Sequence, residues 1–372
     1  MKKVIVSVTN DLFSDQRVDK VCHSLLSMGF DILLVGRCYA NSPSITPRAY
    51  HTKRMRLLFK KGFKFYAEYN LRLFFFLLFR KCDILIANDL DTLLPNFLIS
   101  KLKKKSLVYD SHEYFCGLPE LIGRPIVQYI WKRIEQFCVP KVPNMITVCQ
   151  SIADIYDKEY PKRAHKVTVI RNFPKRSTPH CSATRADLGL PEHTPLIVMQ
   201  GAINKDRGAE ELILAMHEID NACLLIIGDG DIILALKNLV RTQHLENKVR
   251  FIPRINPEQL FAYTQLCDIG CSLEKDTNLN YRYCLPNKLF DYLKAGLPVV
   301  VSNLPEMAQI VHHSHIGEVL SAHSPHNIAL SINKLLNDKN YWQQCHENAL
   351  KASLLYCWEN EEHLLHQLYQ TL

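Results

Sequence analysis

The sequence predicts an α/β protein made of two doubly wound domains, each a mostly parallel sheet covered by helices. Two observations support this fold class. Short apolar runs of strand length alternate with longer amphipathic segments in the first half of the chain, and the same alternation restarts after a polar, proline-broken stretch in the middle. The length of 372 residues also exceeds what one ordinary core needs and suits two domains.

The first half supplies five expected strands, each a short run of aliphatic or β-branched residues. They are Val4–Val8, Asp31–Val35, Ile84–Ala87, Leu107–Tyr109 and Met145–Val148. Between the first two, residues 15–28 carry apolar side chains at helical spacing and are followed by Gly29, which is typical of the end of a helix. We therefore expect an N-terminal Rossmann-like domain over residues 1–172.

The second half repeats the pattern after residues 173–195, whose prolines and polar residues predict an interdomain linker. Helices are expected over Gly208–Ile219 and Asp231–Gln243. The expected strands are Leu196–Met199, Cys223–Ile227, Val249–Ile252, Ile269–Ser272 and Pro298–Val301. These elements predict a C-terminal doubly wound domain over residues 196–355, and a final helix over about 356–372 is expected to pack back on the first domain.

The composition is that of a packed globular protein, with 47% hydrophobic and 22% charged residues. The formal net charge of +8 suits anionic partners such as nucleotide phosphates, phospholipid head groups or nucleic acid. The first apolar run ends at Thr9, too early for a signal peptide, and the longest apolar run, Leu71–Phe79, is far shorter than the roughly 20 residues of a membrane span. Thirteen scattered cysteines without a C-x-x-C pair favour a reducing compartment, so a cytoplasmic protein is expected.

The segment 285–302 is the richest in chemistry: it predicts a helix, a glycine stop and a buried strand. Pro286 is expected in the first helical turn beside Asn287, where free backbone N–H groups form a seat for a diphosphate. Lys288 adds a positive charge in the same turn. Asp291 lies one turn further, where a carboxylate can accept hydrogen bonds from two ribose hydroxyls. The alternative is a plain amphipathic helix whose lysine and aspartate are solvated.

The residues from Asp291 to Val300, DYLKAGLPVV, closely resemble the A-G-x-P-V-V signature of glycosyltransferase family 4, retaining enzymes with the GT-B fold. Further motifs similar to those of the family follow one another in its order along nearly the whole chain. They are Asp15-Gln16-Arg17-Val18, Asn88–Pro95, Tyr109–Glu113, Gly201–Gly208 and Ile227–Gly230. The resemblance implies two Rossmann-like domains facing across a cleft, with a nucleotide-sugar donor between them. It makes residues 1–172 the acceptor-side domain and residues 196–355 the nucleotide-sugar-binding domain.

The resemblance also implies a donor-binding set. The last acidic residue of the family's E-x7-E motif holds the donor ribose, and Asp291 stands at that position. The first glutamate of the motif is replaced by Tyr283, which leaves recognition of the donor sugar open, and Glu274 is an upstream candidate to substitute for it. Ala202 stands where an arginine commonly follows the first glycine of the diphosphate-binding loop.

Arg207 matches the basic position before the second glycine of that loop, and with Lys288 it would hold the donor diphosphate and stabilise the leaving group. A surface arginine is the alternative, although the dipole of the following helix disfavours a cation there. Three glycines either let the backbone approach the nucleotide or form tight turns. They are Gly201, Gly228 and Gly230.

His112 follows an expected strand and aligns with a histidine near the donor sugar in related enzymes, so it is a candidate catalytic residue, with Glu113 a second candidate beside it. Glu113 and four further residues are expected on the acceptor side, although the four, as capping or solvated residues, would look the same. The four are Asp15, Arg17, Asp89 and Asp91.

Basic side chains are interleaved with aromatic ones from Lys53 to Lys81, which favours an interfacial helix on an anionic membrane. The alternative is a domain helix with a basic solvated face. Nucleic-acid binding is the weaker rival because no nucleic-acid motif accompanies the charge. The histidines of His312–His315 are interpreted as part of a solvated loop, and no metal or other cofactor is expected.

These features together predict a retaining glycosyltransferase that moves a sugar from a UDP- or GDP-sugar to a saccharide or lipid-linked saccharide acceptor in surface polysaccharide biosynthesis. It would be cytoplasmic, with peripheral binding to the inner face of the cell membrane as a further expectation. A nucleotide-sugar epimerase is one alternative, although no epimerase carboxylate set is recognisable. A non-catalytic nucleotide-sugar-binding protein is the other, motivated by Tyr283 and Ala202.

Overall fold

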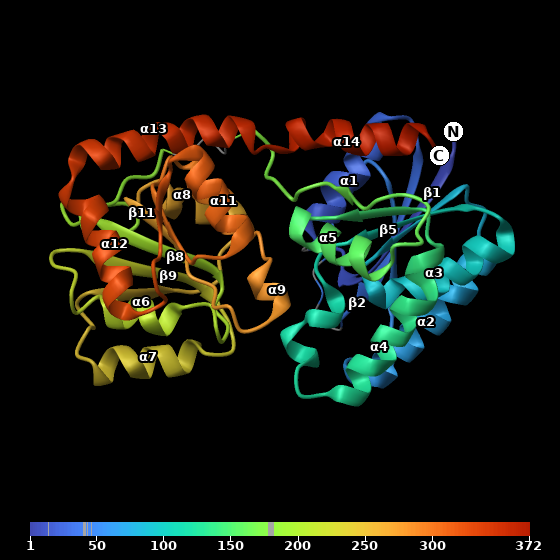
Figure 1. The fold of residues 1–372 in the computed structure, drawn as a ribbon, viewed down its shortest axis with the longest axis horizontal. Coiled ribbons are helices and arrows are strands. Elements are labelled where there is room, and N and C mark those ends of the chain that lie inside the picture. Colours follow the sequence, from blue (N-terminus) through green and yellow to red (C-terminus); the bar gives the residue numbers. More distant parts are fainter. Residues whose placement is uncertain (14, 40–41, 43, 46, 178–181) are drawn as a thin grey trace. The chain divides into compact units, whose positions relative to one another are not determined.

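A computed structural model describes residues 1–372 except 14, 40–41, 43, 46 and 178–181. The chain divides into two compact units (Figure 1). The first unit comprises Met1–Asn172 together with Glu361–Leu372, and the second comprises Phe173–Asn360. Each unit contains one parallel sheet with helices packed around it, as the sequence predicts.

The first unit contains a seven-stranded sheet in the order β3-β2-β1-β4-β5-β6-β7, and all its neighbouring strands are parallel. Val4 of β1 is paired with Ile32 of β2 on one side and with Ile84 of β4 on the other. The strand order therefore reverses at β1, and ligands of such sheets bind outside the carboxyl ends of the strands near this point. The strands are β1 (Lys3–Asp11), β2 (Asp31–Cys38), β3 (His51–Arg56), β4 (Ile84–Asn88), β5 (Ser106–Ser111), β6 (Asn144–Thr147) and β7 (Thr168–Val169).

The helices of the first unit follow the strands, as right-handed crossovers between parallel strands require. The last helix, α14 (Trp358–Gln370), begins in the second unit and ends in the first, where the ring of Tyr369 lies 6.3 Å from that of Phe30. The others are α1 (Gln16–Ser27), α2 (Gly62–Leu78), α3 (Leu90–Lys103), α4 (Pro125–Cys138) and α5 (Gln150–Glu159), with the short 3-10 helices η1 (Phe115–Gly117), η2 (Pro119–Leu121) and η3 (Val139–Lys141).

The second unit contains a six-stranded parallel sheet in the order β10-β9-β8-β11-β12-β13. Its strands are β8 (Leu196–Ala202), β9 (Cys223–Asp229), β10 (Val249–Ile252), β11 (Ile269–Ser272), β12 (Val299–Val301) and β13 (Gly317–Val319). Its helices are α6 (Ala209–Ala215), α7 (Ile233–Thr242), α8 (Pro257–Thr264), α9 (Leu279–Arg282), α10 (Asn287–Lys294), α11 (Pro305–Ser314), α12 (Pro325–Asn337) and α13 (Lys339–Leu355).

The central strand β8 explains why the strands of this fold read as unbroken apolar runs. Ile197 and Met199 belong to the core on one face of the sheet, and Leu196 and Val198 belong to the core on the other. A parallel sheet covered by helices on both faces buries both sets of side chains. The predicted fold class, two doubly wound α/β units, is confirmed.

The structure differs from the sequence-based expectations in three segments. The stretch from Lys53 to Lys81 is not one helix, because its first residues form the edge strand β3 and the helix begins only at Gly62. His312 and His313 lie in the last turn of α11 rather than in a loop. Phe173 and Leu190, at the two ends of the expected linker, are buried in the core of the second unit. None of the helices in the described part of the chain is long and apolar enough to cross a membrane.

Candidate functional site

The second unit brings Arg207, Glu274 and Lys288 together at the carboxyl end of its sheet. Glu274 lies two residues beyond β11, its side chain is 1% exposed, and its Oε2 accepts a hydrogen bond of 2.9 Å from the Ser272 hydroxyl. The Nζ of Lys288 lies 2.7 Å from Oε1 of Glu274, and Nη1 of Arg207 lies 3.9 Å from the same oxygen. Three separate segments of the chain therefore contribute to one charged cluster.

The electrostatics of this cluster favour the charged forms of Glu274 and Arg207. Burial raises the pKa of Glu274, but the Lys288 ammonium and the Arg207 guanidinium more than offset this, so the pKa is lowered. Burial lowers the pKa of Arg207, and the Glu274 carboxylate reverses the effect, so that pKa is raised. Two cations therefore face one carboxylate, and the excess positive charge suits an anionic ligand. Arg207 is the more accessible cation, with a side chain 27% exposed against 7% for Lys288.

Helix α10 carries Lys288 in its first turn. The structure corrects one detail of the sequence analysis, because Pro286 is the N-cap residue in an extended conformation and the helix begins at Asn287. The side chain of a proline has no hydrogen-bonding group, so the Pro286 side chain does not cap the N–H groups in the first turn of α10. The N-terminus of α10 thus lies next to the charged cluster, where the dipole and Lys288 favour the same sign of ligand.

Asp291 is held in place by two residues that the sequence analysis missed. The side-chain amide of Gln200 donates to Oδ2 of Asp291 over 3.2 Å, and its carbonyl oxygen accepts a 2.7 Å hydrogen bond from the Thr264 hydroxyl. Gln200 is the last buried residue of β8, immediately before Gly201. A polar residue closing an apolar strand was the only signal in the sequence that could have indicated it.

The three glycines of the donor-binding prediction have different structural roles. A Cβ added to Gly228 would lie 2.0 Å from the carbonyl oxygen of Gly201, and one added to Gly230 would lie 2.0 Å from that of Ile203. Close packing of the backbone after β9 against the loop after β8 therefore accounts for these two glycines. Gly201 has a φ of +108° and open space where a side chain would project, so its backbone is accessible.

Tyr283 and Ala202, the two residues that differ from the family pattern, also belong to the second unit. Tyr283 is the C-cap residue of α9 and is partly exposed, while Ala202 is exposed at the end of β8. The carboxylate that meets the two cations is therefore that of Glu274. Its signal in the sequence was its place directly after an apolar strand.

The first unit forms a second cluster around His112, which follows β5. The backbone N–H of His112 donates to Oδ1 of Asp89 over 2.8 Å, and its Nδ1 lies 3.5 Å from Oδ2 of the same residue. Its Nε2 lies 3.1 Å from Oδ1 of Asn88 and 3.7 Å from Oδ2 of Asp110. Both ring nitrogens therefore face hydrogen-bond acceptors.

This environment makes His112 a cation at neutral pH. Burial lowers the pKa of the imidazole, but the carboxylates of Asp89 and Asp110 raise it to about 9. Burial also raises the pKa of Asp110, whereas Arg17 and His112 lower it, so Asp110 stays ionised. A doubly protonated imidazole supplies positive charge and N–H donors and has no lone pair with which to act as a base.

The other residues expected on the acceptor side occupy varied environments. Arg17 is 4% exposed and is bound inside the unit, 2.8 Å from Asp110 and 3.1 Å from the carbonyl oxygen of Ile170. Asp15 caps α1 by accepting from the Val18 N–H over 3.1 Å. Structural roles account for both. Glu113 is partly exposed beside His112.

Asp91 is buried in the first turn of α3 and accepts a 2.5 Å hydrogen bond from the Thr9 hydroxyl. Burial and the nearby Asp89 carboxylate raise the pKa of Asp91 to about 8, so this carboxyl is mostly protonated at neutral pH. Asp89 itself occupies the left-handed region, with a φ of +57°, at the junction of β4 and α3.

The described residues contain no group of three or more histidine, cysteine or acidic side chains that could hold a metal ion. The cluster of the second unit has excess positive charge, and the cluster of the first pairs its cations with carboxylates.

Comparison with protein families places both halves of the chain in one group. The model described as Glycosyltransferase Family 4 matches residues 15–173, and the model described as Glycosyl transferases group 1 matches residues 182–352. An uncharacterized glycosyltransferase of Methanocaldococcus jannaschii is 26% identical over 182 residues, which are 47% of this chain and 45% of the relative. The lipopolysaccharide core biosynthesis glycosyltransferase LpsD of Rhizobium meliloti is 27% identical over 173 residues, 46% of this chain and 48% of the relative. The aligned part of the chain thus spans about half the length of these curated relatives.

Solved structures of low sequence identity share the fold over the whole chain. Sucrose-phosphate synthase from Thermosynechococcus elongatus superposes with a TM-score of 0.81 at 16% identity and covers 100% of this chain and 99% of its own. HepE of Anabaena, solved with UDP-glucose, superposes with a TM-score of 0.77 at 14% identity and covers 100% of both chains. The two family models and these shared folds lead to one conclusion: the chain belongs to glycosyltransferase family 4, group 1, with the two-domain GT-B fold.

Proposed function

We propose that this chain is a retaining glycosyltransferase that moves a sugar from a UDP- or GDP-sugar to a saccharide or lipid-linked saccharide acceptor. The observation that supports the proposal most is the pairing of Arg207 and Lys288 around one carboxylate beside the N-terminus of α10. As the bond between sugar and phosphate breaks, negative charge grows on the nucleoside diphosphate. Preorganised cations next to that charge stabilise the transition state more than the ground state.

The nucleotide would bind the second unit, with its diphosphate at Arg207 and the first turn of α10 and its ribose at Asp291. The hydrogen bond from Gln200 fixes the Asp291 carboxylate, which leaves acceptor capacity for ribose hydroxyls. Gly201 offers open backbone on the same edge of the sheet. The UDP and UDP-glucose named for the HepE structures support a nucleotide of this class.

The first unit would supply His112 to the transferred sugar or to the bond that forms with the acceptor. Because His112 is a cation held by Asp89 and Asn88, its proposed contribution is electrostatic and positional. The acceptor hydroxyl would attack from the same face that the diphosphate leaves, so the configuration at the anomeric carbon is retained.

A lipid-linked acceptor would place this enzyme at the inner surface of a membrane. Large apolar side chains are exposed on α2 and the loop before it: Leu58 is 77%, Phe63 75% and Phe79 80% exposed. Lys60, Lys61 and Lys64 are exposed between them. Such a mixture suits an anionic bilayer, where each basic side chain near the surface is worth about 1 kcal/mol. A role in surface polysaccharide biosynthesis is consistent with the name of LpsD.

The function is tested by two assays on the full chain. A thermal-shift screen with UDP, GDP, ADP and their sugars identifies the nucleotide. Incubation of the stabilising sugar nucleotide with saccharide acceptors then distinguishes the proposals, because a transferase forms a new glycosidic product and an epimerase converts the donor without an acceptor. A non-catalytic binding protein leaves every donor intact, and that result would refute the proposed activity.

The membrane part is tested by co-sedimentation with vesicles. Binding is expected to rise with the anionic lipid fraction, to fall with added salt, and to drop when Lys60, Lys61 and Lys64 are replaced by glutamate. Equal recovery in the supernatant with neutral and anionic vesicles at low salt would leave the stretch as an ordinary solvated surface.

A further inference from the structure

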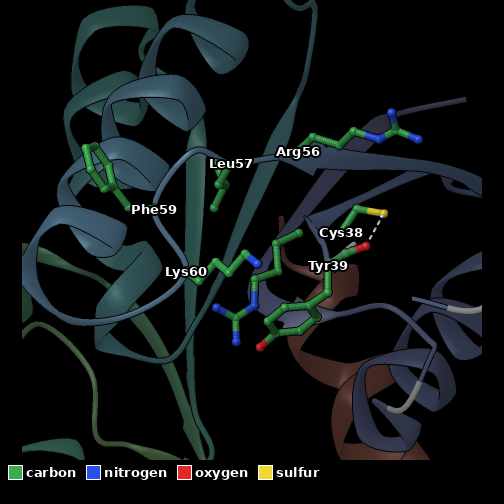
Figure 2. Close-up of a pocket in the computed structure, with 7 residues that line it drawn as sticks. Cys38, Tyr39, Arg56, Leu57, Phe59 and Lys60 are labelled. Carbon is green, nitrogen blue, oxygen red and sulfur yellow. Dashed lines mark hydrogen bonds between the residues drawn. The ribbon is translucent and has the colours of Figure 1, made fainter. Parts of the chain in front are cut away.

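The first unit contains a cavity that neither the donor site nor the His112 cluster uses. It has a volume of about 360 Å³ and lies where β2 and β3 end. Figure 2 shows Lys60, Leu57 and Tyr39 directed into it, whereas the guanidinium of Arg56 and the ring of Phe59 extend away. Among the described residues that line it, three are basic and none is acidic: Arg37, Cys38, Tyr39, Arg56, Leu57, Phe59 and Lys60.

Arg37 is the cation of this cavity whose guanidinium stacks on aromatic rings. Its guanidinium carbon lies 4.0 Å from the ring centroid of Tyr39 and 4.4 Å from that of Phe65. Stacking on aromatic rings fixes the plane of a guanidinium while leaving its N–H edge available for acceptors. Its Nε is buried without a hydrogen-bond partner in the described part of the chain, and burial lowers the pKa of Arg37. This is a desolvated charge with unused donor capacity.

The carboxylates near the cavity are engaged by other cations. Asp11 is bound 2.9 Å from Arg54 by both of its oxygens. Glu68 lies 2.7 Å from Arg72 and also accepts hydrogen bonds from the backbone N–H groups of residues 58 and 59. These last bonds fix the loop that carries Lys60. Among the residues that the structure describes, neither Arg37 nor Lys60 forms an ion pair with a carboxylate.

We propose that this cavity binds a phosphate or diphosphate group of the acceptor, held by Arg37 and Lys60. The description of the ligand as the acceptor rests on the proposed function. The binding of the anion itself rests only on the stacked guanidinium, the directed lysine and the absence of acidic lining. A planar guanidinium matches two oxygens of a phosphate, and an ammonium adds a point charge.

The place of the cavity in the sheet supports this assignment. It lies at the carboxyl ends of two strands of a parallel sheet, the edge at which such folds bind ligands. Arg56 also lines a second hollow between β3 and α2, together with the exposed Phe75 and the partly buried Phe76. The phosphate of a lipid head group and that of a soluble sugar phosphate share the chemistry that this cavity recognises.

The experiment measures the affinity of the full chain for inorganic pyrophosphate by calorimetry, with excess UDP present to occupy the second unit. The test variant is Arg37→Gln/Lys60→Gln. The matched control is Arg133→Gln/Lys158→Gln, which removes the same charges from exposed positions of the same unit. Arg207→Ala is titrated in parallel, so that pyrophosphate bound by the second unit is recognised.

The test variant is expected to lose at least tenfold in pyrophosphate affinity, since each charge-assisted hydrogen bond to phosphate contributes about a factor of ten or more. The control and Arg207→Ala should stay within about twofold of wild type. Equal losses of affinity in the test variant and the control would show that only the net charge matters, which would contradict a specific site. Unchanged affinity in the test variant would also overturn the proposal. Failure of Arg207→Ala to affect UDP binding would count against the donor site alone.

Two further titrations identify the source of the phosphate. One uses glucose 1-phosphate with glucose as its uncharged control, and the other uses phosphatidylcholine vesicles with and without phosphatidic acid. Loss of either phosphate-dependent signal in Arg37→Gln/Lys60→Gln, with retention in the control variant, supports the cavity and names the source. Retention of both signals in the test variant contradicts it.

Discussion

The charged clusters of the two units stand at equivalent places in similar sheets, yet their charge balance differs. In the second unit Arg207 and Lys288 share the single carboxylate of Glu274. In the first unit Arg17 and His112 are matched by Asp110 and Asp89. The same topology therefore provides one edge with excess positive charge, suited to a diphosphate, and one edge that is nearly neutral, suited to positioning sugar hydroxyls. Because the two units share a topology, the residues that follow the strands account for the difference in charge between the clusters.

The largest expected effect concerns stability in the second cluster. Lys288→Ala leaves the buried Glu274 carboxylate with only the more distant Arg207, and removing one partner of a buried pair costs about 3–5 kcal/mol. Urea denaturation of the full chain, with the transitions of the two units fitted separately, should show this loss in the second unit. Lys237→Ala, an exposed change in the same unit, should alter stability by less than about 0.5 kcal/mol.

Glu274→Gln combined with Lys288→Ala should recover part of the loss, because no uncompensated charge then remains buried. A Lys288→Ala protein as stable as the Lys237→Ala protein would show that the Glu274–Lys288 pair is not formed as described.

The next effect separates the two clusters by function. His112→Ala should lower kcat about 100-fold, since an electrostatic contact made at the reacting atoms is lost, but should leave nucleotide affinity within about twofold. His165→Ala, an exposed histidine in the same unit, is the matched control. Steady-state kinetics and calorimetry measure the two quantities. A His112→Ala enzyme with wild-type kcat would make His112 a structural residue.

A further expected effect is a pH dependence in the first cluster. The raised pKa of Asp91 means that the folded chain holds a proton that the unfolded chain releases above about pH 4. Stability should therefore fall as pH rises from about 4 towards 8, by at most roughly 1.4 kcal/mol per pH unit. Asp91→Asn should flatten this part of the profile in urea denaturation, and an identical slope in both proteins would contradict a protonated Asp91.

Protonation of His112 should make the stability of the protein depend on pH in a higher pH range. The His112 pKa of about 9 in the folded chain exceeds the ordinary value of 6.5, so its stabilisation is complete below about pH 6.5 and is lost as pH rises through 9. His112→Gln should therefore differ most from wild type at pH 6 and little at pH 10. A difference that grows with pH would contradict an imidazolium.

The fold was predictable because parallel strands buried on both faces are unbroken apolar runs, and all ten expected strands are present. The edge strands β3, β7 and β13 escaped prediction because they are short or polar and are defined by pairing with a neighbour. Arg207 and Lys288 were expected to act together, and the structure places both at Glu274. Arg207 and Lys288 are 81 positions apart in the sequence, and their meeting at one buried carboxylate depends on tertiary packing, which local patterns do not encode.

The partners of His112 illustrate the same limit. Asn88, Asp89 and Asp110 were visible as polar residues after two expected strands, but their arrangement around one imidazole depends on β4 and β5 being neighbours. The cavity beside Arg37 was also not predicted, because it is formed in part by the edge strand β3, whose basic sequence does not resemble a buried strand.

The central claim is that the second unit binds a nucleoside diphosphate through its unbalanced cations. Calorimetric titration of UDP and GDP into the full chain, Arg207→Ala and the exposed control Arg241→Ala tests it most directly. Removing one charge-assisted contact to phosphate, worth about 1.5–3 kcal/mol, should weaken binding about tenfold or more in Arg207→Ala and leave Arg241→Ala unchanged. Equal affinities in all three folded proteins would contradict the assignment of Arg207 to the diphosphate.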